Sequence, residues 1–211
     1  MKWWAALIGF LLTPAMAGLP GAPATAQPTP TQNVRGQIIA ADASSVTVKT
    51  APEGTPVRLA LAPGLSVTSL TKASYSEVKE GTYVAIATVP IGHVSRWEYE
   101  PTLRALGLQI FPESVKGEGE GHRKWDLAPN SMMTHGTVFQ LDGERALTIR
   151  FNGIDRVVQV TKTTPVVKVG LGDKALLTPG ASIFAVTQKG ANGHLTAQRI
   201  AVGRDGLVPP M

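Results

Sequence analysis

The chain has 211 residues, a formal net charge of +5 and no cysteine. The lack of cysteine excludes disulfides, thiolate metal sites, cysteine nucleophiles and lipid attachment at a cysteine. The positive charge suits an anionic partner. Because Lys and Arg are scattered along the chain rather than clustered, we expect no nucleic-acid binding.

The N-terminus has the layout of a secretory signal peptide: one lysine, an apolar run and then small residues. Cleavage fits before Gly18 or before Gln27, and we favour the second because the stretch between them lacks an apolar pattern. We expect a signal peptide over 1–26, a disordered linker over 27–33 and a periplasmic protein. A retained membrane anchor is the alternative, but the apolar run is shorter than the roughly 20 residues that span a bilayer. No later run is apolar enough, so we expect no transmembrane segment in the mature chain.

Three blocks of the sequence recur in the same order, which favours a duplication over chance resemblance in a Val- and Gly-rich chain. Gly36 and Gly81 of the first copy match Gly136 and Gly180 of the second. The matching blocks are 34–50 with 134–151, 77–89 with 176–188, and 103–110 with 195–202.

Within each copy, apolar and polar residues alternate, as in 45–50 and 146–151. This period of two is typical of half-buried antiparallel strands. Turn-forming residues at 42–45 and 142–144 separate the predicted strands.

The last predicted strand of each copy slips out of phase at the same place. Leu103 and Ala105 are in phase, but the next apolar position, Leu108, comes three residues later. Ala197 and Ile200 repeat this slip in the second copy. The pattern predicts a β-bulge, which lets a strand bend far enough to close a small barrel.

Each copy therefore reads as three strands, a crossing segment and a two-strand hairpin, the order of an OB-like five-stranded barrel. A β-sandwich is the alternative. Helix is expected only as short turns within 71–79 and 173–177. The predicted fold is all-β with two tandem barrels. Its expected divisions are a first barrel over 34–111, a central connecting segment over 112–133, a second barrel over 134–204 and a C-terminal tail over 205–211.

The central segment holds the candidate site, because GEGEGHRKWD gathers glycines, charges and an aromatic ring within a few positions. His122, Arg123, Trp125 and Asp126 are the predicted binding residues. The glycine N–H groups and Arg123 suit an anion, and Trp125 offers a stacking face. In the alternative interpretation the segment is a structural strap. Trp125 and Leu127 then fill a gap between barrels, and Asp126 caps a turn or pairs with Arg123.

Two other kinds of site have weaker support. His122 and His135 with Met132 and Met133 suit copper or zinc in type but not in spacing, and His93 and His194 are isolated. Glu98 and Glu100 share one strand face and suit a glycan hydrolase. No nucleophile elbow or phosphate-binding loop occurs. We expect no metal, no cofactor and no catalytic residue.

The segment FPESVKGEGEGHRKWDL over 111–127, with the strand pattern on either side, resembles an uncharacterised family of exported proteobacterial proteins. These proteins have tandem OB-like β-barrels and a central GEGHRxWDL-type segment. The resemblance implies fold and export and assigns no catalytic residue. The sequence thus predicts a non-catalytic periplasmic binding or assembly module of the cell envelope, with an unknown envelope protein or an anionic ligand as its partner. A metal-handling accessory protein or an envelope glycan hydrolase are the alternatives.

Overall fold

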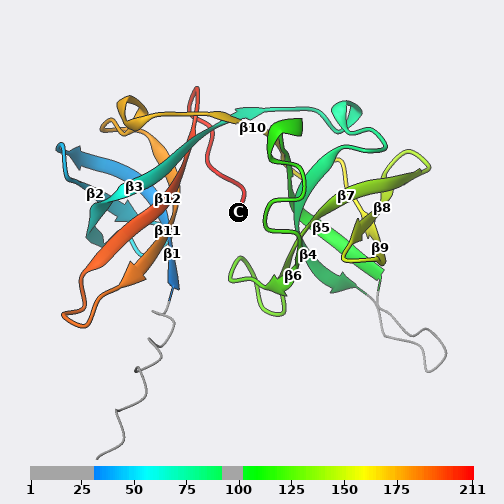
Figure 1. Ribbon diagram of the computed structural model, residues 1–211, viewed down its shortest axis with the longest axis horizontal. Helices are drawn as coiled ribbons and strands as arrows, with labels where there is room; N and C mark the ends of the chain where they lie inside the picture. Colours follow the sequence, from blue (N-terminus) through cyan, green and yellow to red (C-terminus); the bar gives the residue numbers. More distant parts are fainter. Residues whose placement is uncertain (1–30, 92–101) are drawn as a thin grey trace, which may run out of the picture.

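The computed structural model describes residues 31–91 and 102–211. The expected signal peptide and the candidate residues His93, Glu98 and Glu100 lie outside these ranges. In the described residues the fold is all-β, with strands joined by short 3-10 helices and no α-helix (Figure 1). No helix in this part of the chain is long and apolar enough to cross a membrane.

The alternating segments of the sequence form strands because each can bury one face. The strands are β1 (Thr31–Ala41), β2 (Ser45–Thr50), β3 (Pro56–Lys72), β4 (Tyr83–Ile91), β5 (Thr102–Ile110), β6 (Gly121–Lys124), β7 (Met132–Asp142), β8 (Ala146–Phe151), β9 (Ile154–Gln159), β10 (Val166–Leu171), β11 (Ser182–Lys189) and β12 (Leu195–Gly203). The 3-10 helices are η1 (Tyr75–Glu77), η2 (Glu113–Val115) and η3 (Lys174–Leu176). The short helical turns expected within 71–79 and 173–177 are confirmed. The linker expected over 27–33 is wrong at its end, because residues 31–33 pair with β11.

Five strands form a closed barrel. Strands β1, β2 and β3 are antiparallel neighbours, and β1 also pairs with β11. β11 pairs with β12, and β12 returns to β3 in parallel, which closes the ring. This closed barrel stands at the left of Figure 1.

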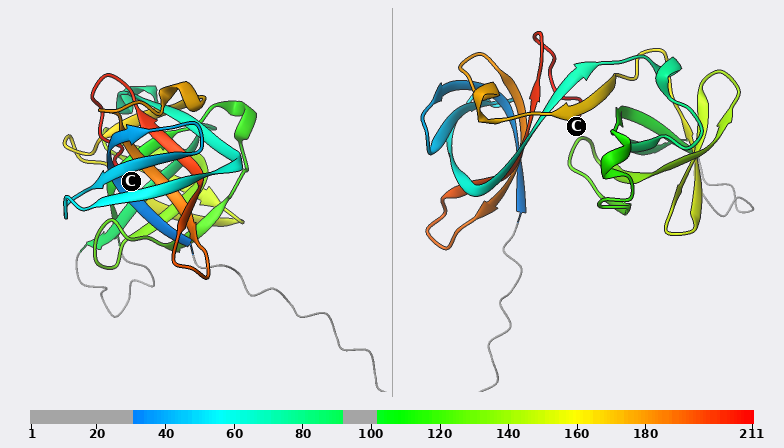
Figure 2. Two further views of the ribbon diagram at one scale, coloured as in Figure 1. Left: turned by 90° about the vertical axis from the view of Figure 1, so that its left-hand side faces the viewer. Right: turned by 45° about the horizontal axis from the view of Figure 1, so that its top comes forward.

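The second lobe, at the right of Figure 1, contains β4, β5, β7, β8 and β9, with β6 at its edge. β4 pairs with β5 and with β7, and β8 lies between β7 and β9. A short parallel pairing of β5 with β9 joins the two ends of this set. The end of β3 and β10 run between the two lobes, as the right-hand view of Figure 2 shows.

The two lobes are not built from consecutive residues. The closed barrel takes β1 to β3 from the first half of the chain and β11 and β12 from its end, whereas β4 and β5 join β7 to β9. The expectation of one barrel over 34–111 and another over 134–204 is therefore wrong. The β4–β5 hairpin pairs with β7 and β9, and the β11–β12 hairpin pairs with β1 and β3, so each hairpin joins strands from the other half of the chain. This arrangement is called here the exchange of hairpins. Alternation reports which face of a strand is buried, but not which partner buries it.

The glycines that match in the sequence make reciprocal contacts across this exchange. Gly81 donates its N–H to the carbonyl oxygen of Val138 on β7, and Gly180 donates to that of Ile38 on β1, both at 2.8 Å. Both turn glycines have positive φ, 84° at Gly81 and 92° at Gly180. Each hairpin therefore begins at the same kind of contact with the other half of the chain.

The predicted bulges are confirmed in β5 and β12. In β5, Ala105 pairs with Thr88 of β4 and Gly107 pairs with the adjacent Ala87. Leu106, between them, has no partner on β4 and forms the bulge. In β12 the corresponding shift lies between Ala197 and Arg199, with Gln198 extra. These bulges bend the strands where each set curves.

Three apolar clusters hold the fold together. One fills the closed barrel and one fills the second lobe. The third, named here the interlobe cluster, lies between them and joins β4 and β7 to β11. Its buried members are Leu70, Ala85, Ala87, Met133, Val167, Val169, Phe184 and Met211, and Trp125, Leu127, Val186 and Ala201 pack against them.

The segment 205–211 is packed against the protein. Met211 is only 4% exposed and belongs to the interlobe cluster. A Cβ atom on Gly107 would lie 2.3 Å from the carbonyl oxygen of Pro210, so glycine is needed where this segment crosses β5. Arg35 donates from Nε to the carbonyl oxygen of Met211 at 2.5 Å. This segment thus contributes to the contact between the lobes.

Candidate functional site

The central segment folds back on β7 as a short hairpin. In β6, His122 lies opposite Thr134 and Arg123 lies opposite Met133. Because side chains alternate along a strand, Arg123 shares the face of Met133, which is buried in the interlobe cluster. His122 and Lys124 lie on the other face. Nδ1 of His122 is 2.8 Å from Oγ1 of Thr134.

After β6 the chain is anchored to the closed barrel. The ring of Trp125 lies 5.7 Å from that of Phe184 on β11. Asp126 accepts two hydrogen bonds from the Arg35 guanidinium on β1, at 2.5 and 3.1 Å. Burial opposes ionisation of Asp126, but hydrogen bonds from Arg35 and Asn33 outweigh it and lower the pKa of this carboxyl group. Trp125, Asp126 and Leu127 therefore act as the strap that the alternative interpretation expected, although Asp126 pairs with Arg35 and not with Arg123.

The glycines of the segment serve turns. Gly117 and Gly119 have φ values of 85° and 65°, which L-residues seldom adopt. The N–H groups of Glu118 and Glu120 donate to the carbonyl oxygens of Val115 and Gly117. These two donors are therefore used within the turns of the segment itself.

Arg123 and His135 are brought together instead. The Arg123 guanidinium lies 2.9 Å from Nε2 of His135 and donates to the carbonyl oxygen of Gly119 at 3.4 Å. Burial, with the charges of Arg123 and Arg199, lowers the pKa of His135 from 6.5 to about 4. The imidazole is therefore neutral at pH 7. Burial and the charge of Arg199 also lower the pKa of Arg123.

Arg199 and Arg35 are the functional residues that sequence reasoning missed. Both come from the closed barrel, far along the chain from 112–133. Arg199 has an unremarkable sequence context, the run TAQRIAV. Its charge acts on Arg123 and His135 from the other lobe, so no local signal in the sequence could have identified it.

The predicted metal ligands do not converge. His122 and His135 are on opposite faces of the β6–β7 pair, because one lies opposite Thr134 and the other opposite Gly121. Met133 is buried in the interlobe cluster, and His194 is exposed. Among residues 31–91 and 102–211, no three His, Cys, Asp or Glu side chains are grouped to hold a metal.

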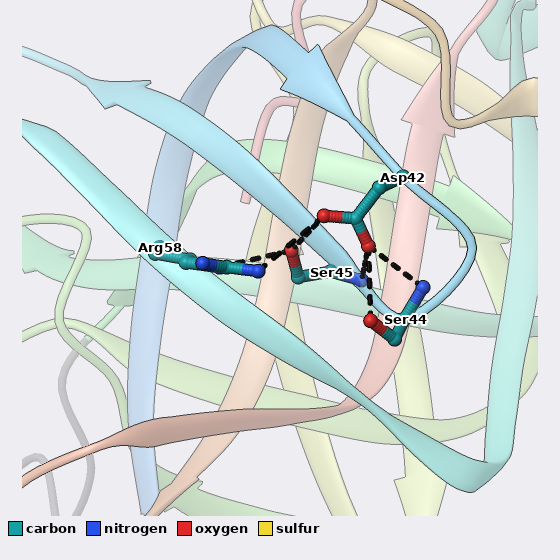
Figure 3. Close-up of polar contacts among 4 residues, drawn as sticks. All are labelled: Asp42, Ser44, Ser45 and Arg58. Carbon is teal, nitrogen blue, oxygen red and sulfur yellow. Dashed lines mark hydrogen bonds and ion pairs between the residues drawn. The ribbon is translucent and has the colours of Figure 1, made fainter.

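A second polar cluster, at the turn between β1 and β2, is shown in Figure 3. Asp42 accepts hydrogen bonds from the backbone N–H groups and the hydroxyls of Ser44 and Ser45, at 2.7 to 3.0 Å. Arg58 donates to Oγ of Ser45 at 3.0 Å. The hydroxyl of Ser45, followed by the groups of Ser44, holds the pKa of Asp42 well below its usual range. The predicted turn at 42–45 is confirmed, and this cluster stabilises it.

The corresponding turn between β7 and β8 borders a shallow, open depression of about 330 Å³. Its lining includes Asp142, Arg145, Gln159 and Thr161. Asp142 accepts hydrogen bonds from Thr148 and Gln140, at 2.8 and 2.7 Å, so its carboxylate is occupied by its own hairpin. The pair of arginines near His135 is therefore the stronger candidate for a site.

Comparisons of the chain with protein-family models, with curated proteins and with solved structures found no match.

Proposed function

We propose that the protein is a non-catalytic binding or assembly module of the cell envelope, exported to the periplasm, which binds an acidic extended segment of another envelope protein. The observation that carries this proposal is the edge of β6. Among the described residues β6 pairs with β7 only, so its other edge is open for pairing. An extended peptide can add to such an edge through main-chain hydrogen bonds.

The charges on β6 select the partner. His122 and Lys124 are exposed, and both lie on the face turned away from the interlobe cluster. Basic side chains on an edge strand deter pairing with neutral or basic strands. An acidic segment would instead gain a complementary charge when it pairs, which favours its association and sets its specificity.

The anchoring of the central segment also supports a binding role. Trp125 and Asp126, directly after β6, are held by Phe184 and Arg35 of the closed barrel. The N–H of Trp125 donates to the carbonyl oxygen of Ser131 at 2.8 Å, which fixes the turn that leads into β7. Since β6 is fixed at this end, a partner strand would meet an ordered edge and lose less entropy on binding.

For the fold we propose two OB-like units that arose by duplication and exchanged their hairpins. The matching bulges in β5 and β12 and the reciprocal contacts of Gly81 and Gly180 support this history. Superposition of β1, β2, β3, β11 and β12 on β7, β8, β9, β4 and β5 tests it. A shared path through both bulges is expected, and a different path would contradict the proposal.

The binding proposal is tested with a fluorescein-labelled peptide of alternating Glu and Val, and with a matched peptide in which Lys replaces Glu. Fluorescence anisotropy should show binding of the acidic peptide alone. Lys124→Glu should weaken it at least about tenfold through charge reversal. Lys49→Glu, which places the same change on an exposed position of β2, is the control. Equal binding of both peptides, or unchanged binding by the Lys124 variant, would overturn the proposal.

A further inference from the structure

Two arginines from opposite lobes act on the imidazole of His135, and neither has an acidic partner among the described residues. Arg123 donates to the carbonyl oxygen of Gly119 and to the imidazole of His135, and neither group carries a negative charge at pH 7. The side chain of Arg199 makes no hydrogen bond or ion pair with any residue of 31–91 and 102–211. A guanidinium ordinarily forms its strongest contacts with carboxylate or phosphate, so this pair is incomplete.

The strand registers bring the two side chains to the rim of the interlobe cluster. In the closed barrel Arg199 lies opposite Val186, and Ala201 lies opposite Phe184. Val186, Ala201 and Phe184 all pack in the cluster. Arg199 shares their face, since it is two residues from Ala201 along β12. From the second lobe, Arg123 approaches on the face of Met133.

His135 lies beside both arginines. Its ring packs 5.8 Å from that of Phe111, and its Nε2 accepts from Arg123. The charges of Arg123 and Arg199 both act on this imidazole, and Arg199 also acts on Arg123. Both arginines are exposed, and their like charges repel each other, an effect that a bound anion would offset.

The interlobe cluster also contains a buried donor that lacks an acceptor among the described residues. Nε1 of Trp125 is buried and, among the described residues, has no hydrogen-bond partner. A buried donor without a partner costs free energy, and such groups commonly mark a missing water or ion. Among the described residues of the interlobe cluster and its rim, these groups are thus donors or positive charges, which an anion would complement.

We propose that a small oxyanion, carrying phosphate or carboxylate oxygens, binds between Arg123 and Arg199 and joins the two lobes. Each guanidinium presents parallel N–H donors that match the oxygens of either group. This site uses the inward face of β6, whereas the proposed acidic partner uses its open edge and Lys124. The inference therefore goes beyond the proposed function, and either can fail while the other stands.

The test uses the full chain in chloride buffer, with inorganic phosphate and succinate as separate probes. Isothermal titration calorimetry should show one site for at least one probe, and the probe that binds identifies the oxyanion class. That probe should also raise the unfolding temperature, as a ligand of the folded state must. Arg199→Gln and Arg123→Gln should each weaken binding at least about tenfold. Lys189→Gln, which removes one charge from the exposed end of β11, should bind like the wild type.

A conservative variant and a spectroscopic measurement test the proposal even if a glutamine variant is unstable. Arg199→Lys keeps the charge but lacks the bidentate donor geometry of arginine. This variant should fold like the wild type and bind the probe more weakly. The imidazole signals of His135, assigned with His135→Gln, should move on addition of the bound probe in the wild type and not in Arg199→Gln. Wild-type affinity in Arg199→Gln, or no binding of either probe at millimolar concentration, would overturn the proposal.

Discussion

Arg35 on β1 and Asp126 in the central segment form a bidentate ion pair that links the second lobe to the closed barrel. The two donor–acceptor distances are 2.5 and 3.1 Å, and 91 residues separate the partners in sequence. Arg35 makes two further contacts: it donates to the carbonyl oxygen of Met211, and its guanidinium lies 5.1 Å from the centre of the Phe184 ring. One side chain thus joins three parts of the chain at the interlobe cluster.

The first prediction compares the two partners of this pair. Asp126→Asn removes a half-exposed charge and should lower the free energy of unfolding by about 1 kcal/mol or less. Arg35→Ala also removes the contacts with Met211 and Phe184, and it should cost about 2 kcal/mol. Urea denaturation followed by circular dichroism measures both. Equal losses would show that the additional contacts of Arg35 contribute nothing.

The second prediction concerns the indole of Trp125. Trp125→Phe keeps a ring against Phe184 and removes the buried N–H that has no acceptor. In the anion-free protein it should therefore be neutral or slightly stabilising. Trp125→Ala removes the packing and should cost about 2 to 3 kcal/mol, less than for a fully buried ring. Thermal unfolding distinguishes the two variants, and a large loss in Trp125→Phe would contradict the account of this N–H group.

The third prediction concerns the matched glycines of β1 and β7. A Cβ atom on Gly36 would lie 2.1 Å from the carbonyl oxygen of Lys49, and one on Gly136 would lie 2.4 Å from that of Arg150. Alanine at either position must displace backbone and should cost about 3 kcal/mol. Gly64→Ala is the matched control, because a Cβ there meets nothing within 4 Å. Chemical denaturation that shows three similar stabilities would contradict the prediction.

The fourth prediction concerns pH and His135. Burial, followed by the charges of Arg123 on β6 and Arg199 on β12, lowers the pKa of this imidazole from 6.5 to about 4. The unfolded chain therefore binds the proton more readily than the folded protein. The free energy of unfolding should therefore be unaffected by this residue above pH 6.5 and should fall as the pH drops from 6.5 to about 4. Below pH 4 the protonation of His135 should cause no further loss. The total loss should not exceed about 3 kcal/mol.

The variant His135→Gln provides the control for the pH prediction. It should flatten the dependence of the free energy of unfolding on pH between 4 and 6.5, whatever it does to stability at pH 7. Denaturation curves recorded across this range measure the slope. A slope that is as steep in the variant as in the wild type would assign the acid sensitivity to other groups.

Local features of the fold could be predicted from the sequence, because they follow from neighbouring residues. The alternation at 45–50 and 146–151 gives β2 and β8, and the phase slips before Leu108 and Ile200 give the bulges. These signals depend on side-chain spacing within one strand. The short helical turns likewise follow from local residues, such as the capping side chain of Ser74.

The pairing of strands could not be predicted in this way. A hairpin such as β11–β12 buries the same apolar face in either lobe, so its sequence is compatible with both partners. The candidate site depends on that choice: the central segment by itself indicates Arg123, whereas Arg199 lies on β12 and acts on it from the other lobe. The sequence indicates the strap role of Trp125 as an alternative interpretation. It does not indicate Arg35 as the partner of Asp126, because Arg35 lies on a different lobe.

The exchange of hairpins also determines when the protein can fold. The closed barrel begins with β1 at Thr31 and needs β12, which ends at Gly203. A ribosome must therefore release almost the whole chain before this ring can close, whereas the strands of the second lobe are complete at Gln159. Such long-range closure is slow compared with local pairing. During synthesis the second lobe can therefore assemble first, and β1 and β3 meet their partners β11 and β12 only when the end of the chain emerges.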